Sequence, residues 1–571
     1  MDLPNFLLTL DSRLKQAEAK LAAAAALAHN QGASGLWKLD QGSSGSSSLH
    51  SNLQNEMTTS QLHSKNPWSP DLSNIGTFLE GSPGTQGVDE WFEQTGPIAS
   101  QFEFEQFQSL MESSQDQCTQ EETLTLFSDP LRFDASAPSS RPPEPPIAPH
   151  LSIEFSKRYF EIFHLIMPMI NESRFHEEAA KRPFSPEAQV LLHATGILGA
   201  STMPEYESYV KLCYDQTRRL LDEYGRQESG YHLTRLENLQ AYVILAFFEF
   251  RRPNFARAWL TLGRAIGLAK ILGLCRTETR PCLATQWGLR DIPPSYADDA
   301  IEEERRRTFW ALYILDGFAN IRTNSGSTFE FEASVSVPLP TTFESPDISA
   351  PNCPMPCLRE VFEVSERPEL STFAATVIMT HLYQRYFEHI QASIKESSYS
   401  FWDAHYLISK ELSYCRENLL LEHFAGRNSD HSLSIAMRMH LDAVDIMLHD
   451  MALTKAKNGG LPSGIITESL SKFSLAAADI VLTAEMGQRL TGHDFERFRQ
   501  LDSFLLWPIT TAIQAYSRLL YSRQADASLY INQLRLLAVA MSDLINPDNI
   551  PMDLLEKVND RVAMAERSIK V

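Results

Sequence analysis

The chain has 571 residues, of which 43% are hydrophobic and 21% charged, and its formal net charge is −22. This composition is typical of a packed globular protein and excludes a fully disordered or fibrous one. The acidic balance disfavours nucleic-acid binding over most of the surface, because duplex affinity depends first on neutralising phosphates. The longest strongly apolar run, Ala241 to Phe248, is far shorter than the roughly 20 residues of a membrane span. The start MDLPNF lacks the pattern of a signal peptide, and cysteines are sparse, so we expect a reduced, intracellular protein without membrane segments.

Residues 1–30 carry a helical pattern with apolar residues at alternating spacings of three and four. This is the seam of a coiled coil over about three heptads. The seam predicts dimerisation through Leu7, Leu10, Leu14 and Leu21. An alanine-rich amphipathic helix packed on its own domain remains the alternative, since alanine fills half of the later seam positions.

Residues 31–150 read as a disordered linker, rich in Gly and Ser at first and in Pro at its end. Within it, residues 89–134 hold eleven acidic residues against one basic residue, Arg132. Acids keep interspersed aromatic side chains soluble and accessible, which is typical of a transcriptional activation segment that folds onto a coactivator. The aromatic residues in question are Trp91, Phe92, Phe102, Phe104, Phe107 and Phe127. A spacer that packs intermittently on the domain is the alternative.

Residues 151–571 are predicted to form one all-α domain, because nearly every segment has helical periodicity and none alternates with period two. The run from Ala241 to Phe250 is apolar on all sides and predicts a central buried helix. The segment from Thr323 to Pro356 is poor in helical pattern and predicts a long ordered loop between two helical halves. The helical spacing of Gly263, Gly267 and Gly273 predicts close helix packing at these positions.

The sequence offers little catalytic or metal-binding chemistry, and we expect no catalytic residue, cofactor or metal site. Phosphate-binding loops and nucleophile elbows are absent. Cys353 and Cys357 lack the second pair of ligands that a structural zinc site needs, so two loop thiols are the simpler interpretation. His440, Asp445 and His449 fall on neighbouring helical turns, but core and rim positions of one helix explain them equally well.

One all-α enzyme class shares a short motif with this chain. Asp298, Asp299 and Glu302 match the aspartate-rich metal motif of terpenoid synthases, but the second metal motif of that class is absent. A short motif without its context is weak evidence, so this enzyme is kept only as a minor alternative.

Four segments resemble the fungal-specific transcription factor domain, the middle homology region of fungal zinc-cluster regulators. They are Tyr159 to Ile170 followed by Arg174-Phe175, Ala258 to Leu274, Glu303 to Asp316 running on to Arg322, and the pieces Phe401 to His405 and Met447 to Pro462. The last pieces are similar to the branch of the amylase-gene and xylanase-gene regulators. The residues that carry the resemblance most clearly are Trp259, Arg264, Arg307, Phe309, Trp310, Asp316 and Arg322.

The resemblance implies a nuclear, non-catalytic regulator, an activator of a secondary-metabolite cluster or of carbohydrate-utilisation genes. The implied partners are a second copy or a zinc-cluster regulator, together with coactivators. The six-cysteine DNA-binding cluster of the family is missing from these 571 residues. DNA binding is therefore expected only if an upstream cluster is restored or a partner supplies one. The alternative is a co-regulator that pairs with a zinc-cluster factor and does not read DNA itself.

Overall fold

The computed structural model describes the chain from residue 147 onward, with gaps. The described ranges are 147–181, 185–226, 234–252, 255–274, 299–323, 337–341, 355–362, 370–395, 400–420, 431–522, 526–544 and a few residues between 556 and 567. Within them the regular structure is helical, apart from an isolated antiparallel bridge between Pro338 and Cys357, so the all-α prediction is confirmed there. The predicted coiled coil of residues 1–30 and the acidic-aromatic segment 89–134 lie outside the described residues and stay predictions.

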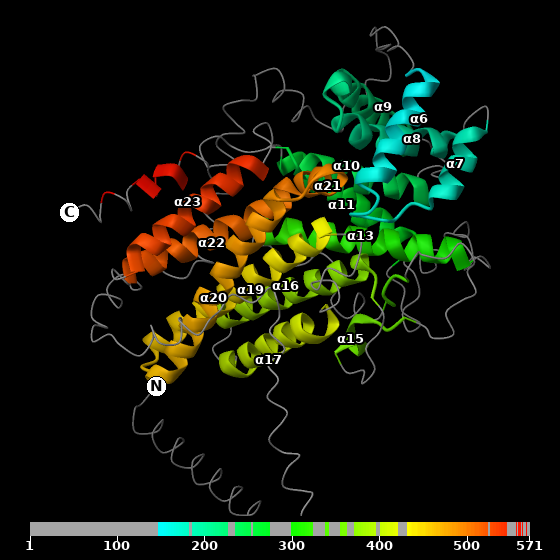
Figure 1. The fold of residues 1–571 in the computed structure, drawn as a ribbon. Coiled ribbons are helices and arrows are strands. Elements are labelled where there is room, and N and C mark those ends of the chain that lie inside the picture. The colour runs from blue at the N-terminus through cyan, green and yellow to red at the C-terminus, as the bar shows by residue number, and fades with distance from the viewer. Residues whose placement is uncertain are drawn as a thin grey trace, which may run out of the picture. The chain divides into compact units, whose positions relative to one another are not determined.

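The first group of helices is arranged around α10 (Leu236–Phe250), which packs against α8 and α11 (Figure 1). Every α10 residue from Asn238 to Phe250 is buried, as its continuous apolar run predicts. Ser185 begins α8, accepting a hydrogen bond from the Ala188 amide, and Pro186 occupies the first turn. The other members are α6 (Pro149–Ile162), α7 (Glu172–Ala180), α8 (Pro186–Ser201), η1 (Pro204–Tyr206), α9 (Glu207–Arg226) and α11 (Phe255–Ile271).

The second group follows α13 (Asp299–Thr323), which packs against α10 and α11 and also against α16, so it joins the two groups. In this group α16 contacts α19, and α19 lies along α20 and α22 (Figure 1). Its members are α15 (Leu358–Val361), α16 (Thr372–Lys395), α17 (Phe401–Tyr414), the π-helical turn η2 (Cys415–Leu419), α19 (His431–Asn458), α20 (Ser463–Gln488), α21 (Gly492–Gln500), α22 (Asp502–Ser522) and α23 (Ala527–Leu544).

Two buried side chains of α13 anchor the described pieces of the predicted crossing loop. Trp310 donates its indole N–H to the Pro338 carbonyl at 2.8 Å, and Arg307 donates to the Thr341 carbonyl at 2.5 Å. Arg307 also donates to Glu303 Oε1 at 2.9 Å, and that same oxygen accepts from the Thr341 amide at 2.9 Å. These contacts hold 337–341 against α13 without helical structure.

Close approach between helices occurs at glycines other than those expected from spacing. A Cβ on Gly199 of α8 would lie 2.7 Å from the carbonyl carbon of Phe155 in α6. Gly263 and Gly267 instead lie on an exposed face of α11, where an added Cβ meets nothing within 4 Å. The prediction of close packing at these two glycines is therefore wrong, because spacing places residues on one helix face but does not say whether that face is covered.

Candidate functional site

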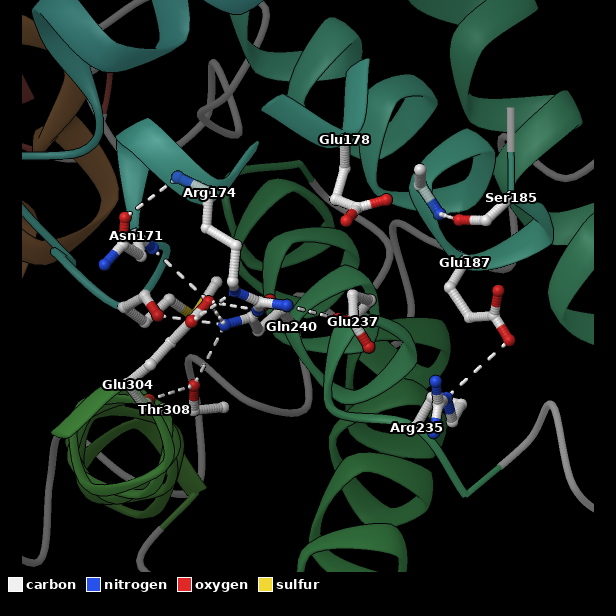
Figure 2. A network of polar contacts seen from close by, with 12 residues as sticks. Asn171, Arg174, Glu178, Ser185, Glu187, Arg235, Glu237, Gln240, Glu304 and Thr308 are labelled. Carbon is white, nitrogen blue, oxygen red and sulfur yellow. Dashed lines mark hydrogen bonds and ion pairs between the residues drawn. The ribbon is translucent and has the colours of Figure 1, made fainter. Parts of the chain in front are cut away.

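A network of charged and amide side chains lies where α7, α8, α10 and α13 meet. Asn171 begins α7 by accepting a hydrogen bond from the Arg174 amide at 3.0 Å. This cap fixes the first turn of a nine-residue helix, and it is from this turn that Arg174 extends toward α10 and α13 (Figure 2).

Arg174 joins two carboxylates that come from different helices. Its Nε and Nη2 donate to the two oxygens of Glu304 in α13 at 2.9 and 2.8 Å, a bidentate pair. Its Nη1 donates to Glu237 Oε1 in α10 at 2.8 Å. Nε, Nη1 and Nη2 are therefore all occupied by carboxylates, and one guanidinium faces two negative charges.

Glu304 is the central acceptor of this network, and its side chain is only 2% exposed. Besides Arg174, its Oε1 accepts from the Asn171 amide at 3.3 Å and from Gln240 Nε2 at 3.0 Å. The fully buried Gln240 also donates to the Met169 carbonyl at 2.9 Å. Figure 2 shows these contacts converging on Glu304. A buried carboxylate with this many donors ties three segments of the chain together.

The electrostatic balance keeps the guanidinium of Arg174 charged. Burial disfavours its charged form, but the hydrogen bonds and charges of Glu304 and Glu237 outweigh burial and raise the pKa of Arg174 above its ordinary value. The guanidinium of Arg174 therefore stays protonated across the physiological pH range.

Next to this network lies a cavity of about 210 Å³. Charged side chains line part of its wall, and Figure 2 shows Glu178, Glu187 and Glu237 arranged around it. Glu187 of α8 lies 3.7 Å from the guanidinium Nε of Arg235, which precedes α10. Apolar side chains, including Phe175 and Leu191, complete the wall.

Sequence reasoning found the helices of this site but not the site itself. It noted Arg174 as part of one family-like segment and Glu303 and Glu304 as the start of another. The structure uses Glu303 and Glu304 for tertiary contacts with Thr341 and Arg174. The paired residues Arg174 and Glu304 lie 130 positions apart, and no local pattern in one sequence predicts such a contact.

The family-like residues of α13 are core positions. Arg307, Phe309, Trp310 and Asp316 are all buried, and Asp316 accepts from Asn320 Nδ2 at 3.1 Å. On α11, Trp259 is partly buried against Phe250, with ring centroids 6.3 Å apart.

Two further family-like residues lie apart from that core. Arg264 is exposed and lies 3.5 Å from Asp222 of α9, away from the Arg174–Glu304 network. The Arg322 side chain lies outside the described residues.

The three candidate metal ligands do not form one cluster, although His449 Nε2 lies 4.0 Å from Asp445 Oδ1. His440 packs against Tyr383 and Trp507, whereas His449 packs against His405. Asp445 accepts a hydrogen bond from Arg416 at 2.6 Å. Within the described ranges no group of three or more His, Cys, Asp or Glu residues is arranged to hold a metal ion.

The other minor candidates are only partly described. Cys353 and Asp298 lie outside the described residues, whereas Cys357 caps α15. No helix in the described part of the chain has both the length and the apolarity needed to cross a membrane.

The part of the chain that holds this network is similar to a known protein family. Residues 157–352 match the model of the fungal specific transcription factor domain. Asn171, Arg174, Glu237, Gln240 and Glu304 all fall inside the match.

Several curated relatives are similar over stretches of different length. The chain is 29% identical over 397 residues to the depudecin biosynthesis cluster-specific transcription activator of Alternaria brassicicola, covering 67% of this chain and 59% of the relative. It is 24% identical over 292 residues to the azaphilone cluster-specific transcription factor of Aspergillus niger, covering 49% of this chain and 61% of that relative. A pigment biosynthesis transcriptional activator of Monascus ruber is 30% identical over 166 residues, which are 29% of each chain.

These matches are transcription regulators, which are not enzymes, in agreement with the expectation of a non-catalytic protein. The chain spans about three fifths of the length of the depudecin and azaphilone regulators.

Proposed function

We propose that this protein is a fungal transcription regulator that activates a secondary-metabolite gene cluster. The observation that carries the proposal is the alignment of two thirds of the chain with an activator named for one such cluster, together with the family match over residues 157–352. Of the two gene sets implied by the sequence resemblance, the relatives favour secondary metabolism over carbohydrate utilisation.

In this proposal the helical domain is regulatory and the segment 89–134 recruits coactivators in the nucleus. Its ten net negative charges, eleven acids less Arg132, keep the aromatic side chains accessible, and those side chains supply the area that a coactivator can bury. Residues 1–30 would pair with a second copy or with a zinc-cluster regulator.

A co-regulator without DNA binding of its own is the second candidate. It is favoured by one observation, namely that the 571 residues contain no six-cysteine cluster and carry a net charge of −22. Under either candidate, contact with DNA comes from a partner or from residues outside this sequence.

A reporter assay in a fungal host tests the activator function. Residues 89–134 fused to an unrelated DNA-binding module should activate transcription, and changing Trp91, Phe92, Phe102, Phe104, Phe107 and Phe127 to Ala should abolish that activity. Changing six acids to Gln is the matched control and should reduce activity less sharply. A silent fusion, or one that is equally active without its aromatic residues, would leave only the spacer interpretation.

The gene-cluster assignment needs a separate measurement. Overexpressing the chain in its host should raise transcripts of one contiguous biosynthetic cluster, whereas a change confined to carbohydrate-utilisation genes would contradict the assignment.

A further inference from the structure

We propose that acidification detaches α17 from α16 and α19, because protons then bind to His405 of α17 and His449 of α19, which are buried against each other. The rest of the helical domain stays folded in this transition. The proposal goes beyond the proposed function and does not depend on it.

The two histidines form a buried pair across the contact between α17 and α19. Their ring centroids lie 5.2 Å apart at an interplanar angle of 82°, and each residue is only 2% exposed. Among the described residues, His405 Nδ1 and both ring nitrogens of His449 have no hydrogen-bond partner. A buried polar atom without a partner costs free energy. Detachment of α17 would let water satisfy these nitrogens.

The charged groups around the pair include one acid close to a ring. Asp445 Oδ1 lies 4.0 Å from His449 Nε2, but the other oxygen of Asp445 already accepts a hydrogen bond from Arg416 at 2.6 Å. From the packed elements, the titratable groups that face the two rings are His389 of α16, Arg416 of η2, Asp445 and Lys455 of α19, and Glu468 and Lys472 of α20.

These surroundings keep both rings neutral while α17 is docked. Burial lowers the pKa of His405 to about 3, and the neighbouring His449, His389 and Lys472 act in the same direction. Burial also lowers the pKa of His449 to about 4, although Asp445 opposes this shift. The docked helix therefore binds no proton at either ring above about pH 5.

α17 is well placed to move by itself, because it lies at the edge of the second group of helices and packs there against α16 and α19 (Figure 1). Its outer face is open to solvent, with Tyr406 and Leu407 49% and 48% exposed, whereas α10 is buried throughout from Asn238 to Phe250. A helix that is covered on one side opens at a lower free energy than the whole domain.

The size of the effect follows from the proton balance. In the detached helix each ring regains an ordinary pKa of about 6.5. Between pH 7.5 and 5.5 each ring takes up a proton in the open state alone, which raises the opening equilibrium about ten-fold per histidine and about 100-fold for the pair.

Two neighbouring groups modify this shift in opposite directions. Glu411 of α17 opposes it, because burial raises the pKa of this carboxyl in the docked state despite its hydrogen bond from Arg385 at 2.7 Å. His389 adds to it, because its ring lies 4.7 Å from the ring of Phe401 in α17 and burial lowers its pKa to about 4.

Amide hydrogen exchange on the full chain tests the proposal. Exchange is followed by mass spectrometry at pH 7.5, 6.5 and 5.5 and corrected for its intrinsic dependence on pH. We expect the protection factor of peptides from Phe401–Tyr414 to fall about 100-fold from pH 7.5 to 5.5, while peptides of α10 remain unexchanged over the same time. A fall of less than ten-fold, or exchange of α10 at the same rate as α17, would overturn the proposal.

Substitutions identify the groups that bind the protons. His449→Gln and His405→Phe each remove one titrating ring, and phenylalanine at 405 keeps a ring stacked on Phe401, where the present centroids are 5.8 Å apart. Each variant should reduce the loss of α17 protection from about 100-fold to about ten-fold. Protection of α17 at pH 7.5 shows that a variant docks the helix, and either position alone decides the test.

His440→Gln is the matched control. His440 is a buried histidine of α19 as well, but it packs against Tyr383 and Trp507 and not against α17. This variant should leave the pH dependence of α17 protection unchanged. If it reduces that dependence as much as His449→Gln does, or if His449→Gln and His405→Phe keep the full response, the buried pair is not what releases α17.

Discussion

The contact between α6 and α8 at Gly199 provides the sharpest test of the packing. An alanine at 199 would place its Cβ 2.7 Å from the Phe155 carbonyl carbon and 3.0 Å from the Phe155 Cα. Both distances are far inside ordinary van der Waals contact, and the atoms met belong to backbone, so no side chain can rotate away. The two helices must separate for the methyl group to fit.

Two opposing effects set the magnitude of Gly199→Ala. Replacing glycine by alanine inside a helix stabilises it by about 0.5–1 kcal/mol, because the unfolded chain loses freedom. Overpacking a rigid contact costs about 3 kcal/mol, at the upper end of the usual range, because here backbone must move. The net expectation is a loss of about 2 kcal/mol in the free energy of unfolding.

Gly263→Ala is the matched control, since it adds the same methyl group to α11 at a position with nothing within 4 Å. It should stabilise the chain by about 0.5–1 kcal/mol. Urea unfolding followed by far-ultraviolet circular dichroism measures both variants. If the two variants shift the urea midpoint in the same direction, the close contact of α8 with the α6 backbone is not what distinguishes the two glycines, and the reasoning fails.

Three other predictions concern the network, the buried histidines and the N-terminal helix. Glu304→Ala should lower the free energy of unfolding by about 3 kcal/mol, because it removes the acceptor of Arg174 Nε and Nη2 and one of the acceptors of the buried Gln240 amide. Glu172→Ala, at an exposed site, should not have this effect, and equal urea midpoints of the two variants would contradict the prediction. Burial lowers the pKa of His381 and His440 to about 3, so below pH 6.5 the unfolded state takes up protons that the folded state refuses. The free energy of unfolding should therefore fall on acidification by up to about 1.4 kcal/mol per pH unit for each such histidine. Carboxylates such as Asp442, whose pKa burial raises to about 8, oppose this trend in part. If a His440→Gln variant shows the same dependence of unfolding free energy on pH as the unmodified chain, the reasoning is refuted. Leu14→Asp should weaken self-association in sedimentation, because it would bury an unpaired charge in the predicted seam, and an unchanged oligomeric state would argue for a helix packed on its own domain.

The sequence predicts those parts of the fold that depend on local pattern. The apolar run from Ala241 to Phe250 predicts a helix buried on all sides, and α10 is such a helix. The segment with Phe309 and Trp310 resembles a family helix, and α13 buries both residues. Composition is enough to predict such a helix, because a helix that is buried on every side has an apolar residue at almost every position.

Contacts between distant segments are not predictable in the same way. The pair Arg174–Glu304 joins α7 to α13 across 130 residues, and neither residue differs in type from the many exposed acids and bases of the chain. The same limit explains the error at Gly263 and Gly267. A helical stripe of small residues looks the same in sequence whether or not another helix covers it, and α11 leaves that face exposed.

The arginine triplet of α13 shows how such contacts bear on function. Arg305 to Arg307 form the chain's only run of three arginines, the kind of basic cluster that import receptors recognise. In the structure Arg305 donates to the Leu272 carbonyl at 2.7 Å and Arg306 to Glu303 at 2.6 Å, while Arg307 is 2% exposed and holds the crossing segment. Displaying the triplet to a receptor would therefore require breaking the contacts that fix α13 in the core. Arg305 to Arg307 therefore do not form an exposed basic cluster in the structure, and the proposed nuclear location is supported by the similarity to transcription regulators and not by this triplet.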